Sequence, residues 1–472
     1  MKLLNGNKVK LAVVLLTAVT AISTGCGAKT TEGNKSVAGD NAGQASAQTA
    51  GNVETVELTV AGRRPVGDSY GMENLAKAAE KLNQKLEKED SKYRLKVNPV
   101  LKPDDLNQYI IFSSKSGKAP DIAEIGYSNI GWLAEGNYVM QMDDMKNQDV
   151  FKNLMPGYWN AVTWDKHIWG VIQDTEARMV FFYKPHLKKL GWTDEQIAAL
   201  PKKVENGEFT MQDMADVAKQ AVDQKLVKHG FLHNTGPRDV AAFYVNNGVQ
   251  MYDEDKKQYV FDKANVVETF KEVKQLVDSG LLPDSMMTYS EKDRLKEIVN
   301  GTALFVGGGI WEEARFKQNG YHNELGNVNS EWIQQNLGVI LLPPSKKGGK
   351  PITMSNPYVY VASKTTKHPE LVKRLLVEVS APEYQKNHAT QSSHIPFTKE
   401  AQELAKESAF LNSVSYMTNY SKFVPNHPDE PKYEKIRAEA LKNVETGTMT
   451  PEKAAEWMEQ QMKLDLGSIV VK

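Results

Sequence analysis

The sequence predicts an α/β protein of more than one domain, with helices covering both faces of a mainly parallel sheet. At 472 residues, 40% of them hydrophobic and 25% charged, the chain can bury a large core and exceeds the usual length of one domain. Short segments that alternate polar and apolar residues are separated by segments with apolar residues at helical spacing. Strands joined through helices form right-handed crossovers, which place parallel strands side by side.

The first three predicted strands cover residues 53–61, 94–100 and 120–125, with helices over 71–89 and 104–113 between them. In open sheets of this kind, ligands bind beyond the carboxyl ends of the strands. Three segments therefore become candidates for a binding site. They are residues 61–70, residues 124–132 and the segment after a later strand at 303–306.

A second block of elements begins near Gln173. A hairpin with a charged tip is expected over residues 252–262, and a calcium loop there is disfavoured because the distal bidentate glutamate is missing. The other expected strands cover 179–183, 303–306, 337–342 and 358–362, and the expected helices cover 211–225, 265–279, 369–379, 400–407 and 451–466.

The N-terminus is typical of a secretion signal. Residues 1–25 hold three lysines as their only charged side chains, followed by the apolar run 11–22 and then small residues before Cys26. Twelve apolar residues are too few to span a bilayer, which needs about 20. The remaining chain holds 55 Lys and Arg against 59 Asp and Glu, a formal charge of −4. This balance gives no basic face for nucleic acid.

Cys26 is the single cysteine, so an intramolecular disulfide is excluded. The sequence Ser23-Thr24-Gly25-Cys26 resembles the bacterial lipobox, although Ser23 stands where leucine is usual. That resemblance implies a lipid on the cysteine sulfur; a buried inert thiol is the alternative. Residues 27–52 are rich in small and polar residues, which predicts a flexible tether after the lipidated cysteine.

Five stretches of the chain, taken in order, resemble a known family. They are PDIA at 120–123 with IGWLAEGNYV at 130–139 and MDD at 142–144; WDKHIWGV at 164–171 with FFYKPHL at 181–187 and LGW at 190–192; NGTAL at 300–304 with GGIW at 308–311; GVILLPP at 338–344 with GGKP at 348–351, residues 358–362 and SKTTKHPE at 363–370; and HIP at 394–396. Their order and spacing are similar to those of bacterial extracellular solute-binding proteins of the maltose-binding type.

The resemblance implies two α/β lobes joined by crossing strands, with a ligand cleft between them that closes by a hinge motion. Lobe 1 would comprise residues 53–171 and 309–362, and lobe 2 residues 172–308 and 363–472. It also implies a monomeric sugar- or oligosaccharide-binding lipoprotein on the outer face of the cytoplasmic membrane. Such a protein delivers its ligand to the permease of an ABC importer. No cofactor is expected, and no His/Cys metal cluster appears in the sequence.

Sugar recognition uses flat aromatic rings and planar hydrogen-bonding groups. Trp311 follows three glycines and matches the tryptophan that the family commonly stacks on its ligand; core packing is the alternative. The other candidates follow predicted strands or lie at predicted crossings, where turn or capping roles are the alternative. They are Glu124, Tyr127, Asn129, Arg63, Arg64, Asp68, Gln173, Asp174, Glu176, Asn246, Asn247, Asn356, Tyr358 and His394. Trp132, Trp164, Trp169, Trp192 and Trp457 are expected to pack instead.

Two other functions remain open. A surface-anchored carbohydrate enzyme would need a pair of carboxylates, for which Asp121 and Glu124 are the candidates, but nothing beyond their strand position marks them. The sequence contains neither the G-x-S-x-G motif nor a phosphate loop. A binding protein for a peptide, polyamine or other small solute is the second alternative. The eight tryptophans and the family resemblance favour carbohydrate, while Arg63 and Arg64 leave an acidic saccharide open.

Overall fold

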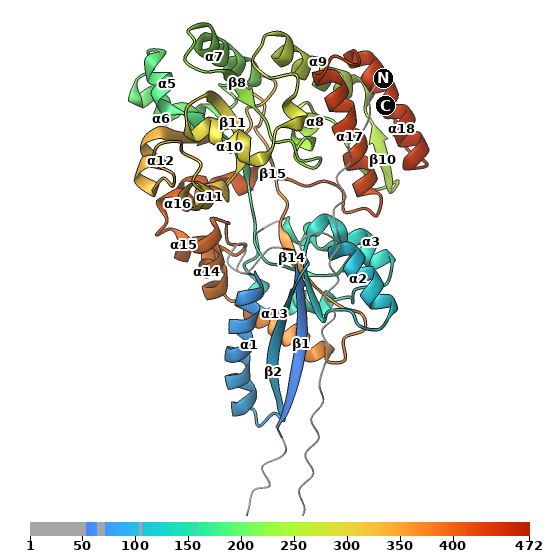
Figure 1. Ribbon diagram of the computed structural model, residues 1–472. Coiled ribbons are helices and arrows are strands. Elements are labelled where there is room, and N and C mark those ends of the chain that lie inside the picture. Colours follow the sequence, from blue (N-terminus) through green and yellow to red (C-terminus); the bar gives the residue numbers. More distant parts are fainter. Residues whose placement is uncertain (1–52, 64–70, 103–105, 156) are drawn as a thin grey trace, which may run out of the picture. The chain divides into compact units, whose positions relative to one another are not determined.

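The computed structural model describes residues 53–63, 71–102, 106–155 and 157–472 (Figure 1). The predicted signal peptide, Cys26 and the tether lie outside these residues, as do Arg64 and Asp68. Within the described residues no helix is both long enough and apolar enough to cross a membrane. The α/β prediction is confirmed, because helices alternate along the chain with the strands of two larger sheets.

The first sheet has five strands. Strand β1 pairs in parallel with β2 and β3, whereas β14 runs antiparallel to β3 and β6. Helix α1 (Gly71–Lys88) packs on β2 and on α13 (Pro369–Val379), and it buries Leu75, Leu82 and Leu86 at the predicted helical spacing. In order across the sheet the strands are β2 (Tyr93–Leu101), β1 (Glu54–Gly62), β3 (Ile122–Gly126), β14 (Tyr358–Ala362) and β6 (Val171–Ile172).

The second sheet has four strands, three of which are built from strongly apolar segments. Helix α7 (Met211–Asp223) packs on β8, and α10 (Glu291–Val299) packs on β11 and β7. Helix α7 begins with a capping box in which Thr210 and Asp213 bond each other's backbone N–H, so its start is encoded locally. In order across the sheet the strands are β12 (Leu337–Ile340), β7 (Arg178–Tyr183), β11 (Ala303–Gly309) and β8 (His229–Leu232).

Both sheets are mixed, which differs from the mainly parallel sheet that was expected. The pairs β1·β2, β1·β3 and β11·β8 are parallel, while β14 and β7 run antiparallel to their neighbours. The antiparallel strands β7 and β14 are those that the chain enters when it passes from one sheet to the other. Parallel neighbours are joined through a helical crossover, which returns the chain to the same end of the sheet. Strands β7 and β14 are entered from the other sheet without such a crossover, so they run in the opposite direction to their neighbours.

The strand pairing also differs from the expected lobe boundaries. Strand β12 was expected in lobe 1, but it pairs with β7 in the four-stranded sheet. Helix α13 was expected in lobe 2, but it packs on α1 and β14 of the five-stranded sheet. The chain therefore passes between the sheets near residues 173–177 and again between β12 and β14. Periodicity shows that a segment is a strand, but not which sheet supplies its hydrogen-bonding partner.

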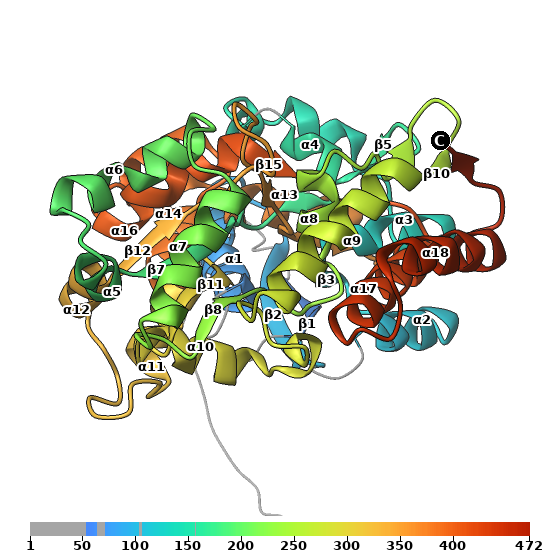
Figure 2. The same ribbon diagram turned by 90° about the horizontal axis from the view of Figure 1, so that it is seen from above.

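The C-terminal helices pack together around α9 (Lys263–Asp278). Helices α17 (Glu430–Glu445) and α18 (Pro451–Asp465) both contact α9, and Figure 2 shows the three beside one another. The hairpin predicted over 252–262 is confirmed as β9 (Tyr252–Asp253) and β10 (Gln258–Phe261). At its tip, Asp253 accepts hydrogen bonds from the backbone N–H groups of Asp255 and Lys256, at 3.1 and 3.0 Å, so this acidic side chain caps the turn.

The remaining elements are short and connect or cover the two sheets. The helices are α2 (Leu106–Lys115), α3 (Ile130–Glu135), α4 (Tyr158–Ala161), α5 (Lys184–Lys189), α6 (Asp194–Glu205), α8 (Ala241–Asn246), α11 (Glu312–Gln318), α12 (Ser330–Asn336), α14 (Pro382–Ser392), α15 (Lys399–Ala405) and α16 (Ala409–Val414). The strands are β4 (Thr163–Trp164), β5 (His167–Ile168), β13 (Thr353–Met354), β15 (Ser421–Lys422) and β16 (Val470–Val471).

Candidate functional site

A hollow of about 210 Å³ lies where the chain passes between the two sheets. It is bounded by the segment before β7, the start of α11, the segment leading into β14 and the end of α14. Five of the predicted binding residues line it: Glu176, Trp311, Asn356, Tyr358 and His394. The other lining residues are Arg178, Glu291, Ala314, Arg315, Gln318, Gln391 and Ser392.

Trp311 contributes its indole ring to the wall of this hollow. A Cβ on Gly309 would lie only 2.1 Å from a ring carbon of Trp311, so the ring packs over the backbone at a position that must be glycine. The ring is also nearly parallel to that of His394, at an interplanar angle of 19° and a centroid distance of 6.1 Å. The guanidinium carbon of Arg178 lies 5.2 Å from the indole centroid, within cation–π range. Trp311 is therefore held in place on several sides and partly covered.

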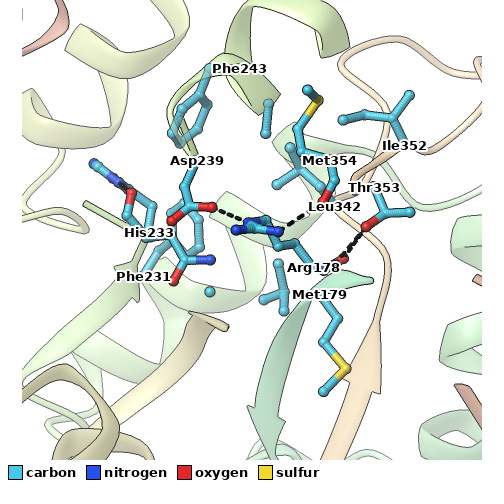
Figure 3. Close-up of a pocket in the computed structure, with 14 residues that line it drawn as sticks. Arg178, Met179, Phe231, His233, Asp239, Phe243, Leu342, Ile352, Thr353 and Met354 are labelled. Atoms are coloured by element: carbon cyan, nitrogen blue, oxygen red, sulfur yellow. Dashed lines mark hydrogen bonds and ion pairs between the residues drawn. The ribbon is translucent and has the colours of Figure 1, made fainter. Parts of the chain in front are cut away.

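Arg178 is one of two arginines that line the hollow, the other being Arg315, and neither was predicted as a site residue. Arg178 forms an ion pair with Glu176. It also forms an ion pair with Asp239 and donates a hydrogen bond of 3.2 Å to the carbonyl oxygen of Met354 (Figure 3). Burial alone would lower the pKa of Arg178, but the two carboxylates raise it above its ordinary value, so the side chain stays charged. For Glu176, burial raises the pKa and the charge of Arg178 opposes that rise. The small cavity of about 40 Å³ beside Arg178 has no room for a saccharide.

Another arginine, Arg238, does not line the hollow but connects the segment before α8 to the segment leading into β14. Its Nε donates to Glu434 at 2.6 Å, and its Nη1 donates to the Oδ1 of Asn356 at 2.7 Å. Asn356 was predicted to bind ligand, and Arg238 fixes its carbonyl oxygen. The charge of Arg238 also lies near the hydroxyl of buried Tyr127, which donates 3.1 Å to the carbonyl oxygen of Val424.

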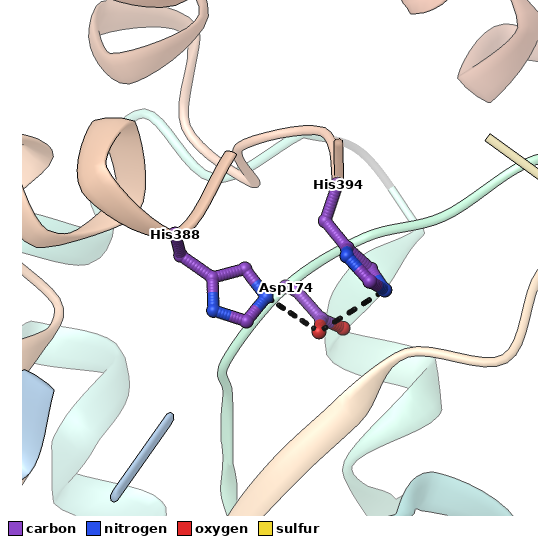
Figure 4. A group of neighbouring side chains, drawn as sticks. All are labelled: Asp174, His388 and His394. Atoms are coloured by element: carbon purple, nitrogen blue, oxygen red, sulfur yellow. Dashed lines mark hydrogen bonds and ion pairs between the residues drawn. The ribbon is translucent and has the colours of Figure 1, made fainter. Parts of the chain in front are cut away.

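Asp174 lies next to His394, which is in the wall of the hollow. Its carboxylate contacts the segment leading into β14, helix α14 and the segment after α14. Its Oδ1 accepts the backbone N–H of Tyr358 at 2.9 Å. Its Oδ2 lies 3.0 Å from the Nε2 of His388 and 3.8 Å from the Nε2 of His394 (Figure 4). Asp174 and both histidines are buried. Asp174 and His394 were predicted site residues, and the structure brings them together with His388, which was not predicted.

Gln173 lies in the first crossing segment and Glu124 in β3. Both side chains are buried next to Gly71. A Cβ on Gly71 would lie 1.8 Å from the Nε2 of Gln173 and 2.3 Å from the Oε2 of Glu124, so these side chains close on the start of α1. Neither amide atom of Gln173 has a hydrogen-bond partner among the described residues. Neither Gln173 nor Glu124 is among the residues that line the hollow.

Other predicted residues have local structural roles. The Oδ1 of Asn129 accepts hydrogen bonds from the indole N–H of Trp132 at 3.2 Å and from the side-chain amide of Asn107 at 3.1 Å. Asn129 stands at the N-cap position of α3, but its side chain makes no cap hydrogen bond. Asn247 follows α8 and donates 3.1 Å to the carbonyl oxygen of Phe243, outside the lining of the hollow. Asn246 donates 2.9 Å to the carbonyl oxygen of Pro343. Arg63 is exposed.

Asp121, which an enzyme would need as one of its carboxylates, has a structural role. Its Oδ2 accepts the backbone N–H of Thr59 at 2.9 Å, and its Oδ1 accepts the hydroxyl of Thr366 at 2.6 Å. Asp121 thereby joins β1 to the segment after β14, and it does not line the hollow.

A larger hollow of about 1280 Å³ is lined by several aromatic side chains. Trp164 and Trp169 are among them, although both were expected only to pack. The indole N–H of Trp169 donates 2.9 Å to the carbonyl oxygen of Trp164, which holds the two residues of this hairpin together. The other aromatic lining residues are Tyr127, His167, Tyr252, Phe423 and His427.

The sequence of residues 77–413 matches the model of a family described as bacterial extracellular solute-binding protein. This chain belongs to that family. No curated protein matches the chain in sequence. Because the matched segment contains most strands of both sheets, the family assignment covers the crossing segments that form the hollow.

Solved structures of solute-binding proteins share the fold of this family member. Maltose-bound MalE3 of T. maritima matches with a TM-score of 0.66 and 18% identity, covering 87% of this chain and all of that one. MalE of Xanthomonas citri matches with a TM-score of 0.70 and 16% identity, covering 88% and 97%. Lmo0181 of Listeria monocytogenes, in complex with cycloalternan, matches with a TM-score of 0.66 and 18% identity, covering 88% and 99%. The predicted two-lobed solute-binding fold is confirmed.

Proposed function

We propose that this solute-binding protein captures a sugar or oligosaccharide between its lobes and delivers it to the permease of an ABC importer. The observation that supports this most directly is the hollow beside Trp311, where an aromatic ring lies next to charged and amide side chains at the crossing segments. An aromatic ring suits the apolar face of a pyranose, and planar polar groups suit its hydroxyls. The structural relatives that were solved with maltose and cycloalternan support the same class of ligand.

Within this proposal, Trp311 and Arg178 act together. Arg178 already lies over the indole ring, so the ligand contacts the part of the ring that faces the hollow, and the guanidinium remains paired with Glu176 and Asp239. Asn356, fixed by Arg238, and the Tyr358 side chain supply hydrogen-bonding groups from the second crossing segment. A paired arginine presents its remaining N–H groups in a fixed orientation, which suits recognition of neighbouring hydroxyls.

A panel of saccharides should contain at least one that raises the melting temperature of the purified protein by several degrees. A ligand at 100 times its Kd adds about 2.7 kcal/mol to the stability of the native state, enough for a measurable shift in a lobe of this size. Thermal unfolding against oligosaccharides, monosaccharides, uronates, peptides and polyamines tests this. The Trp311→Ala variant should lose the shift, measured against its own unliganded melting temperature.

Trp457→Ala is the matched control, because Trp457 lies on α18 and outside the lining of the hollow. It should keep the ligand-induced shift of the unmodified protein. If only a peptide or a polyamine raises the melting temperature, the protein is still a solute-binding protein, but its ligand is not a saccharide. A saccharide shift that persists in Trp311→Ala would contradict the placement of the site.

We also propose that the lipid on Cys26 holds the protein at the outer face of the cytoplasmic membrane, with residues 27–52 as the tether. The Cys26→Ser variant should then appear in the soluble extracellular fraction, because the thiol that accepts the lipid is gone. Membrane fractionation followed by immunoblotting measures this, and Ser23→Leu, which restores the usual lipobox residue, should stay with the membrane. Retention of Cys26→Ser in the membrane fraction would refute lipid anchoring at this cysteine.

A further inference from the structure

We propose that Asp174, His388 and His394 form a binding site for a divalent transition-metal ion of the zinc type. The three side chains come from the first crossing segment, from α14 and from the segment just after it. Their candidate ligand atoms all lie within 4.8 Å of one another, and all three residues are buried (Figure 4). Two imidazoles and one carboxylate are ligands that such ions prefer.

The hydrogen bonds of His394 establish which of its ring nitrogens faces Asp174. Its Nδ1 lies 3.0 Å from the carbonyl oxygen of Ser392 and 2.9 Å from the hydroxyl oxygen of the same residue. That hydroxyl donates its own proton to the carbonyl oxygen of His388 at 2.6 Å, so both neighbours of Nδ1 act as acceptors. The proton of a neutral His394 therefore resides on Nδ1, and Nε2 is the ring nitrogen that would ligate a metal ion beside Asp174.

The separations among the three side chains fit a shared metal ion. The Nε2 of His394 lies 3.8 Å from the Oδ2 of Asp174, and the Nε2 of His388 lies 3.0 Å from the same oxygen. Two ligands on a tetrahedral zinc ion, each about 2.0–2.2 Å from the metal, are separated by about 3.3–3.5 Å. The two observed separations bracket that value.

The surroundings of Asp174 and His394 support metal binding as well. Metal-bound imidazoles usually donate their other N–H to a carbonyl or carboxylate, as His394 does to Ser392. The Nδ1 of His388 has no such partner among the described residues. The second oxygen of Asp174 accepts the backbone N–H of Tyr358, which orients the carboxylate. Three protein ligands leave one coordination position, and His394 lies in the wall of the hollow. A bound ion would therefore join the first crossing segment to α14 next to the proposed ligand site.

Calorimetric titration of the chelator-treated protein with Zn²⁺ tests the proposal without any sugar present. One ion per chain should bind, and His388→Gln and His394→Gln should each weaken that binding by more than the roughly 10–100-fold that loss of a supporting hydrogen bond costs. His167→Gln is the matched control. It removes an exposed histidine that lies 2.8 Å from Asp143 and should leave zinc binding unchanged.

X-ray absorption of the zinc-loaded unmodified protein gives a readout that does not depend on how well the variants fold. Two imidazole ligands together with oxygen ligands are expected. Absence of stoichiometric binding, binding equal in all three variants, or a spectrum with oxygen ligands alone would overturn the proposal. The result is independent of the sugar panel, because zinc binding can fail while a saccharide still binds.

Discussion

The Arg437→Met variant is expected to lose about 3–5 kcal/mol of unfolding free energy, because it leaves the buried carboxylate of Glu430 without a counter-charge. The Nη2 of Arg437 lies 2.6 Å from the Oε1 of Glu430 on the same helix, α17, and both side chains are at most 1% exposed. The guanidinium also lies 4.1 Å from the ring centroid of Tyr433, and the hydroxyl of Tyr259 donates 3.1 Å to the Oε2 of Glu430. Burial raises the pKa of Glu430 to about 7, against the effect of Arg437. Unfolding in guanidinium chloride should therefore be measured at pH 8, where the carboxylate is charged.

Two comparisons make this result specific. Glu459→Gln removes an ion pair with Lys463 at the surface of α18, separated by 2.6 Å, and should cost less than about 1 kcal/mol. Replacing both Glu430 and Arg437 with apolar residues of similar volume should cost far less than Arg437→Met, since no buried charge remains. If Arg437→Met costs no more than Glu459→Gln, the pair does not contribute as the structure indicates.

The second large effect is expected at Glu312, which follows Trp311 and is fully buried in α11. Burial raises the pKa of Glu312 to about 8, although the charge of Arg294 opposes this. Between about pH 5 and pH 8 the folded protein then keeps the Glu312 proton, whereas the unfolded chain, with the ordinary value of 4.5, has released it. The folded state binds more protons in this window, so its stability falls as the pH rises, by at most about 1.4 kcal/mol per pH unit.

Glu312→Gln removes this titration and should become progressively more stable than the unmodified protein from pH 5 to pH 8. The expected difference at pH 8 is on the order of 3 kcal/mol, measured by chemical unfolding at three pH values. Glu331→Gln, at an exposed position on α12, serves as the control and should change the pH profile little. A difference between Glu312→Gln and the unmodified protein that stays constant with pH would show that the carboxyl group is ionised throughout.

The candidate site was predictable in part, and there is a physical reason why some of its residues were predicted and others were not. Trp311, Tyr358 and His394 line the hollow because each lies near the end of a strand or helix at a crossing, and such positions are visible in the sequence. Arg178 and Arg238 were missed, although each left a signal. Arg178 is a charge at the start of the apolar strand β7, and Arg238 follows a Gly-Pro turn. A charge at the edge of an apolar strand requires a partner, but the sequence does not identify the segment that supplies it.

The sequence predicted those helices and strands whose apolar residues follow a clear period, because that period and the local caps are properties of neighbouring residues. Helix α7 with its capping box and helix α1 with its buried leucines are examples. Helices α6 and α17 and strand β8 were not predicted. Only the tertiary structure decided that β12 joins β7, that Asp174 meets His388 across 214 positions, and that Arg238 reaches Asn356 across 118. Backbone pairing and ion pairing depend on distance in space, and packing of the two sheets sets that distance through contacts that no local pattern encodes.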